Sequence, residues 1–169
     1  MTNPKVLQAI HFICFTAEGL PLGATRLNKI LWFAEKDSFL HTLQPMLGLS
    51  FVKGPYGPMP PDADIACKTL AEKGLIFFEP RDYGSYSYKD MHSRRDPDTS
   101  LLTEDELTAL RNLTWEICTE YSARSISDLT HNAIYHMLSM GEDYPLELAL
   151  AENARPATNE EIYDLLQEA

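Results

Sequence analysis

Cysteine is scarce in this sequence of 169 residues, and its three cysteines, Cys14, Cys67 and Cys118, stand far apart. An odd number of cysteines without a CxxC pair predicts neither a disulfide framework nor a zinc knuckle. No apolar run approaches the roughly 18 residues that a membrane span requires, and the opening residues lack the pattern of a secretory signal. We therefore expect a cytoplasmic protein with no membrane partner.

Signatures of common catalytic sites are also missing. The glycines form neither GxGxxG nor a Walker A pattern, and no GxSxG marks a serine nucleophile. The five histidines include no pair at the i, i+4 spacing that aims two imidazoles at one metal from a helix. Glu104, Asp105 and Glu106 form a cluster of carboxylates. Their position in the first turn of a predicted helix explains this cluster, because the helix dipole favours negative charge there. We predict no enzyme activity, no metal and no cofactor.

The composition is that of a globular protein, with 44% hydrophobic and 23% charged residues. We assign residues 1–169 to a single domain, because this length supports one core. The net charge of -11 lies in the last third: residues 1–102 carry 11 Lys and Arg against 11 Asp and Glu, whereas residues 103–169 carry 3 against 14. This acidic surface either provides solubility or attracts a basic protein partner.

The first half of the chain contains three segments that are predicted to form helices. Asn3 followed by Pro4 is typical of a helix start, and Thr25 can cap a second helix. Apolar residues cover a wide face of this second helix, which predicts a central position in the fold. A third helix opens at Asp62 or Asp64.

Residues 48–61, between the second and third helices, have a different character. Four prolines crowd the end of this segment, and each removes a hydrogen-bond donor and restrains its predecessor. We expect a stiff, ordered loop.

A β-hairpin should follow the third helix. Its strands are Ile76–Glu79 and Ser85–Tyr88, joined by a turn at residues 80–84. Helix followed by hairpin is the order of a winged helix. The polar residues 90–100 show no periodicity and are predicted to form a loop.

Two capping pairs mark helices in the second half. Thr103 with Glu106 opens a long helix, and Ser125 with Asp128 opens a shorter helix that ends near Gly141. Residues 156–169 are predicted to form a helical tail. The fold class is therefore mainly α: a compact helical domain with a small β-hairpin, winged-helix-like in its first half.

Nucleic-acid binding is an alternative function for such a fold. The hairpin and the loop after it combine tyrosines with four cations, Arg81, Lys89, Arg94 and Arg95. The helix before the hairpin, however, presents Asp62, Asp64 and Glu72 where a DNA reader needs positive charge. A winged-helix transcription regulator is thus the second choice, and nucleic acid is not the expected partner.

Three segments, in this order, resemble the SocA-like antitoxin family, also called the Panacea domain. Residues 25–34, TRLNKILWFA, are similar to a helix of that family. Residues 54–60, GPYGPMP, resemble its "yGPV.p" loop, and residues 126–131, ISDLTH, match its "Ls.lTH" segment after a long helix.

This resemblance implies a bacterial or phage toxin–antitoxin system, in which the domain binds a cognate toxin protein and blocks it or marks it for a protease. It implies nothing about the oligomeric state. Trp32, Phe33 and Tyr56 either anchor a partner or fill the core, and His131 either hydrogen-bonds inside the fold or touches the partner. The candidate partner-binding residues are Lys29, Trp32, Phe33, Tyr56, Gly57, Pro58 and His131.

Overall fold

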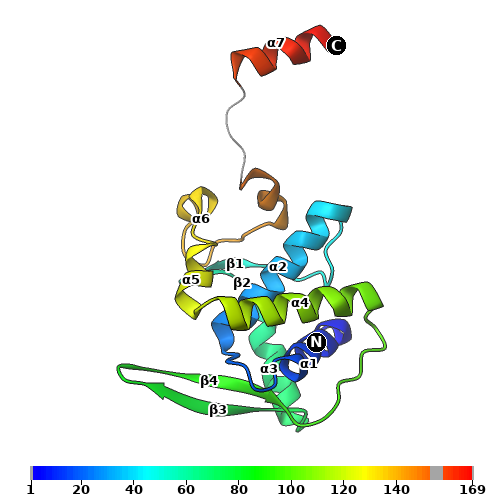
Figure 1. Cartoon of the computed structure of the whole chain (residues 1–169), viewed down its shortest axis with the longest axis vertical. Coiled ribbons are helices and arrows are strands. Elements are labelled where there is room, and N and C mark those ends of the chain that lie inside the picture. The colour runs from blue at the N-terminus through cyan, green and yellow to red at the C-terminus, as the bar shows by residue number, and fades with distance from the viewer. Residues whose placement is uncertain (1, 153–157, 169) are drawn as a thin grey trace.

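Helix α2, Ala24–Thr42, runs through the middle of a mainly helical fold (Figure 1). The computed structural model describes residues 2–152 and 158–168. The expected helical class with a β-hairpin is confirmed, although there are two hairpins rather than one. The other elements are α1 Pro4–Thr16, β1 Val52–Gly54, β2 Gly57–Met59, α3 Pro61–Glu72, β3 Ile76–Tyr83, β4 Tyr86–Ser93, α4 Glu104–Glu120, α5 Ala123–Asp128, α6 Ala133–Met137, the 3-10 helix η1 Leu146–Ala151 and α7 Asn159–Glu168.

The central position predicted for α2 is confirmed by its neighbours. Helices α4 and α5, strand β2 and the 3-10 helix η1 all contact it, while α1 packs against α3 and α4. Leu27, Ile30 and Leu31 of α2 are fully buried. Burial of such side chains contributes roughly 1.5–3 kcal/mol each, so α2 carries a large share of the core.

Trp32 joins α2 to two later segments in the core. Its ring lies 5.0 Å from the ring of Phe51 and 5.1 Å from that of Tyr144, both in edge-on geometry. Because only 1% of Trp32 is exposed, it fills the core, one of the two roles predicted for it.

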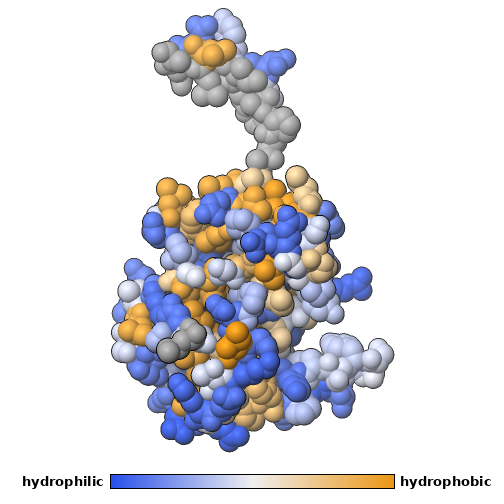
Figure 2. Space-filling view, turned by 180° about the vertical axis from the view of Figure 1, so that it is seen from behind, coloured by the Kyte–Doolittle hydropathy of each residue, from blue (hydrophilic) through white to orange (hydrophobic). Residues whose placement is uncertain are grey.

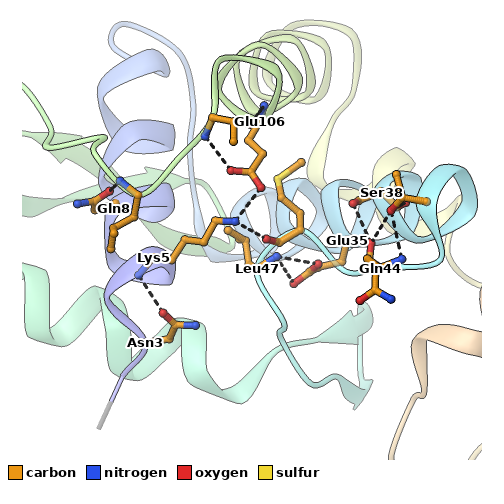
Figure 3. A network of polar contacts seen from close by, with 12 residues as sticks. Asn3, Lys5, Gln8, Glu35, Ser38, Gln44, Leu47 and Glu106 are labelled. Carbon is orange, nitrogen blue, oxygen red and sulfur yellow. Dashed lines mark hydrogen bonds and ion pairs between the residues drawn. The ribbon is translucent and has the colours of Figure 1, made fainter.

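Buried and half-buried polar groups join α1, α2 and α4 to the segment after α2 (Figure 3). The carboxylate of Glu35 accepts hydrogen bonds from the backbone N–H groups of Leu47, at 3.1 and 3.2 Å, and Leu49, at 2.8 Å. The ammonium of Lys5 donates to Glu106 at 2.7 Å and to the carbonyl of Met46 at 2.9 Å. These contacts hold the segment after α2 against the core.

The proline-rich segment is a short hairpin rather than the loop that we expected. Strands β1 and β2 pair antiparallel with Val52 opposite Met59 and Gly54 opposite Gly57. On its other side β1 contacts the segment after α6: Lys53 N–H donates to the Glu142 carbonyl at 2.8 Å, and Gly141 N–H donates to the Lys53 carbonyl at 2.9 Å. These partners lie about ninety residues away in sequence, where local patterns carry no information about them.

The hairpin β3–β4 is longer than predicted and projects from the helical body (Figure 1). Its turn consists of Gly84 and Ser85, so that Pro80 lies within a strand. The loop predicted for residues 90–100 is wrong at residues 90–93, which belong to β4. Asp90 and Met91 are buried where β4 packs on α1, and the N–H of Met91 donates to the Leu22 carbonyl at 2.9 Å; local polarity does not predict these tertiary contacts.

Helix starts agree with the capping patterns at Asn3 and Thr103, both of which accept the expected backbone hydrogen bonds. The start at Thr25 is wrong, because Gly23 occupies the N-cap position. A Cβ atom at Gly23 would lie 3.0 Å from the ring of Tyr88, so the close packing of this ring favours glycine.

Two further helix predictions are wrong in detail. Helix α3 begins at Pro61, whose missing N–H costs nothing at a first helical position, rather than at Asp62 or Asp64. The single helix predicted after Ser125 is divided into α5 and α6. Ser122 caps α5, and a second cap at Asn132 accepts from the N–H of Tyr135 and starts α6.

The 3-10 helix η1 also packs on α2, and Glu152, directly after η1, forms an ion pair with Lys36. Helix α7 falls within the tail predicted at 156–169, of which residues 156, 157 and 169 lie outside the described residues. Within residues 2–152 and 158–168, no helix is long and apolar enough to cross a membrane.

Candidate functional site

Three segments that are remote in sequence meet at one point, which we call the motif junction. It comprises Lys29 of α2, Gly57 of β2, Thr130 and His131 between α5 and α6, and Tyr135 of α6. Gly57 has a φ of +114°. A Cβ atom on it would lie 2.1 Å from the Thr130 hydroxyl oxygen and 2.3 Å from the Lys29 ammonium nitrogen. Only glycine therefore fits between these two side chains.

Lys29 is the most unusual residue of the motif junction. Only 1% of it is exposed, and among the described residues no carboxylate forms an ion pair with it. Burial alone lowers the pKa of its ammonium to about 7. The fold thus holds an amine without an ion-pair partner next to the hairpin β1–β2.

His131 stacks on Tyr135 with ring centroids 4.1 Å apart and planes nearly parallel. Its Nε2 atom is buried and has no hydrogen-bond partner within the described part of the chain. Burial, followed by the positive charge of Lys29, lowers the pKa of this imidazole. The ring is therefore neutral at pH 7, and Nε2 is a free hydrogen-bonding atom.

Tyr135 ties α6 to the tip of the hairpin β1–β2. Its hydroxyl donates to the Gly54 carbonyl at 3.0 Å and lies 3.2 Å from the Pro55 carbonyl. The ammonium of Lys53 sits 4.1 Å from the centre of the Tyr135 ring, a cation–π contact. These contacts hold the tip in one conformation.

Exposed apolar side chains lie close in sequence to the residues of the motif junction. Tyr56, at the tip of the hairpin β1–β2, is 62% exposed, and Leu129, which precedes Thr130, is 56% exposed. Met137 and Met140, which follow Tyr135 along the chain, are also exposed. We call these four residues the junction surface; methionine and tyrosine are common at protein-binding surfaces.

Only some of the predicted partner-binding residues reach solvent. Tyr56 is exposed, and Phe33 and His131 are half-buried. The four remaining candidates, Lys29, Trp32, Gly57 and Pro58, are buried. Sequence reasoning missed Tyr135, because its role depends on hydrogen bonds to a hairpin about eighty residues earlier.

Two of the four cations of the alternative nucleic-acid function, Arg81 and Arg94, have partners within the fold. Arg81 pairs with Glu79 at 2.9 Å and with Asp90 at 3.1 Å, and Arg94 lies 4.7 Å above the ring of Phe77. Lys89 and Arg95 are exposed. Arg94 and Arg95 also line an open cavity of about 310 Å³ beside α1.

Helix α3, which would face DNA in a winged-helix reader, offers little positive charge. Asp62 and Asp64 occupy its first turn, and Lys68 is paired with Asp64 at 2.6 Å. Among the residues that the structure describes, no group of three or more His, Cys, Asp or Glu side chains could hold a metal ion.

The sequence model of the antitoxin SocA-like family, Panacea domain, matches residues 27–134. This range contains nearly all of the first resemblance segment and the whole of the other two, and it covers more than half of the chain. The protein is therefore a member of a family of antitoxin-like domains. More specifically, the chain belongs to the SocA-like, Panacea-domain family. No curated protein and no solved structure matches it.

Proposed function

We propose that this protein is an antitoxin that binds and neutralises a cognate toxin protein in the cytoplasm of a bacterial cell, in a bacterial or phage toxin–antitoxin system. Residues 1–169 act as one domain in this proposal. The single observation that carries it is the convergence of the three family segments at the motif junction, beneath an exposed apolar surface.

The junction surface suits recognition of a protein. The tip of the hairpin β1–β2 is held by Pro55, Gly57 and the hydroxyl of Tyr135, so binding would cost little conformational entropy there. Tyr56 extends from this fixed tip as an aromatic anchor. Membership of an antitoxin family favours such a binding role over catalysis.

The charge of the molecule favours a basic toxin. Residues 103–169 carry 3 Lys and Arg against 14 Asp and Glu, and Glu116 and Glu120 of α4 are exposed. Such a field accelerates association with a cationic protein. Neutralisation could proceed by covering the toxin or by delivering it to a protease, and these two routes differ in whether the toxin level falls.

Helix α3 followed by the hairpin β3–β4 has the order of a winged helix, and DNA binding is the competing function. The acidic first turn of α3 and the ion pairs of Arg81 would oppose phosphate contacts. We therefore propose recognition of a protein rather than of DNA.

Co-expression with the protein encoded by the adjacent gene tests this function. We expect the wild-type chain to relieve growth arrest and to co-purify with that protein. Tyr56→Ala should raise the Kd of the complex about 30-fold, because removing a hot-spot aromatic costs about 2 kcal/mol. Immunoblotting for the toxin distinguishes the two routes of neutralisation. An unchanged toxin level indicates that the antitoxin covers the toxin, and a lowered level indicates proteolysis.

Tyr86→Ala is the matched control, since Tyr86 is 60% exposed on the other hairpin. It should leave both the Kd and the growth unchanged. Equal effects of the two substitutions, or no complex with the wild-type chain, would count against the proposal.

A further inference from the structure

The buried ammonium of Lys29 is a costly feature with no compensation inside the described chain. Transfer of an unpaired cation out of water is strongly unfavourable, so buried charges are normally paired. Glu35, one turn and a half along the same helix, shows the usual solution: its carboxylate accepts backbone hydrogen bonds from Leu47 and Leu49. Lys29 has no such partner, which indicates that its counter-ion comes from outside.

A second observation at the same place also points to a ligand. The Nε2 atom of His131 is buried without a hydrogen-bond partner among the described residues, and His131 lies close enough to Lys29 for that charge to lower its pKa. In the tautomer with hydrogen on Nε2, this atom is a donor. The Thr130 hydroxyl is occupied, since it donates to the Ser127 carbonyl at 2.8 Å. Lys29 from α2 and His131, which follows Thr130 in the connection between α5 and α6, therefore bring two donor groups to the surroundings of Gly57.

The site lies one residue below the surface. Tyr56 precedes Gly57 and Leu129 precedes Thr130, and both Tyr56 and Leu129 are exposed. Because Gly57 has no side chain, only backbone separates Lys29 from the junction surface on the side of the hairpin.

We propose that Lys29 and His131 form a binding site for one carboxylate, supplied by an acidic side chain of the partner protein. The ammonium donates to one carboxylate oxygen and Nε2–H of His131 to the other, and Tyr56 and Leu129 close over the group. The source of the carboxylate rests on the proposed function, whereas the site itself does not.

The charged groups around the site agree with a single anion. Lys53 of β1 and His136 of α6 add positive potential at His131, and Asp128 of α5 is the acidic group that opposes them. Asp128 is exposed and forms no ion pair among the described residues. A carboxylate at Lys29 would favour the charged ammonium, so binding should take up a proton above pH 7.

Acetate, the smallest carboxylate, tests the site without the partner. Amide NMR spectra of the full chain are recorded at pH 6.5 during titration with sodium acetate, with sodium chloride holding the ionic strength constant. We expect saturable shifts of the Gly57, Thr130 and His131 amides, and a Kd that rises at least fivefold between pH 6.5 and 8.5. In Lys29→Met the Kd should rise at least tenfold, whereas Lys68→Met, which removes an exposed lysine, should behave like wild type.

Equal shifts in wild type and Lys29→Met, shifts that do not saturate, or equal shifts with chloride alone would overturn the proposal. If Lys29→Met loses the dispersed spectrum of a folded protein, Lys29→Gln and His131→Phe replace it with the same criterion. Because no toxin is present, failure of this titration leaves the antitoxin proposal standing, and failure of the growth assay leaves the carboxylate site standing.

Discussion

At the scale of the residue, α2 buries two ionisable groups with opposite consequences. Burial raises the pKa of Glu35, although backbone hydrogen bonds from Leu49 and Leu47 partly oppose this shift. Burial lowers the pKa of Lys29, and nothing opposes it. The carboxylate is thus part of the scaffold that holds the segment after α2, whereas the ammonium destabilises the free protein and is available to a partner.

The pH dependence of stability should reveal this cost. In the unfolded chain Lys29 titrates near its ordinary value of 10.5, and folding lowers the pKa to about 7. The folded state binds fewer protons between these values, so the free energy of unfolding rises with pH there, by up to about 1.4 kcal/mol per pH unit for one proton. Lys29→Met should remove this rise, and Lys68→Met should retain it. Denaturant unfolding at pH 7, 8 and 9 measures both, and parallel curves for wild type and Lys29→Met would contradict the account.

At the scale of the element, the side-chain caps at Asn3 and Thr103 were readable from sequence, whereas those at Ser122 and Asn132 were missed. Thr103 accepts from the N–H of Glu106 at 3.2 Å, and the carboxylate of Glu106 accepts from the N–H of Thr103 at 2.9 Å. Such a cap is determined by four consecutive residues, so no tertiary information is needed. The start of α2 at Gly23 was missed because packing of Tyr88, about sixty residues later, selects it.

The cap of α4 supports a prediction about stability. Thr103→Ala should lower the free energy of unfolding by about 1 kcal/mol, because it removes the side-chain oxygen that accepts from the N–H of Glu106; the bond from the backbone N–H of residue 103 to the Glu106 carboxylate remains. Thr108→Ala, at an exposed position within the same helix, should change it by less than about 0.5 kcal/mol. Chemical denaturation of the two variants provides the comparison, and equal losses would show that the cap contributes nothing specific.

At the scale of the whole molecule, local patterns predicted the helical class, but not how the segments meet. The resemblance placed Lys29, Gly57 and His131 in three separate motifs. Only the fold brings these motifs together, at Gly57, where there is no room for a Cβ atom. Trp32 belongs to the same first motif but faces the core, between Phe51 and Tyr144. The sequence of a motif does not show which of its residues lie at the motif junction and which fill the core, because burial depends on the folded chain.

The space-filling view shows apolar patches interspersed with charge over the upper part of the helical body (Figure 2). Apolar residues also lie exposed elsewhere, including Trp115 on α4 and Leu150 on η1. The choice of the junction surface therefore rests on the contacts of Gly57 and Tyr135 beneath it.

Hydrogen–deuterium exchange of the chain, alone and in complex with the protein encoded by the adjacent gene, tests this choice most directly. The account predicts that complex formation protects the amides of residues 54–59 and 126–135 together, because the tip of the hairpin β1–β2 and the connection between α5 and α6 form one surface. Protection confined to the hairpin β3–β4 or to α7, with unchanged exchange at both of those segments, would contradict it.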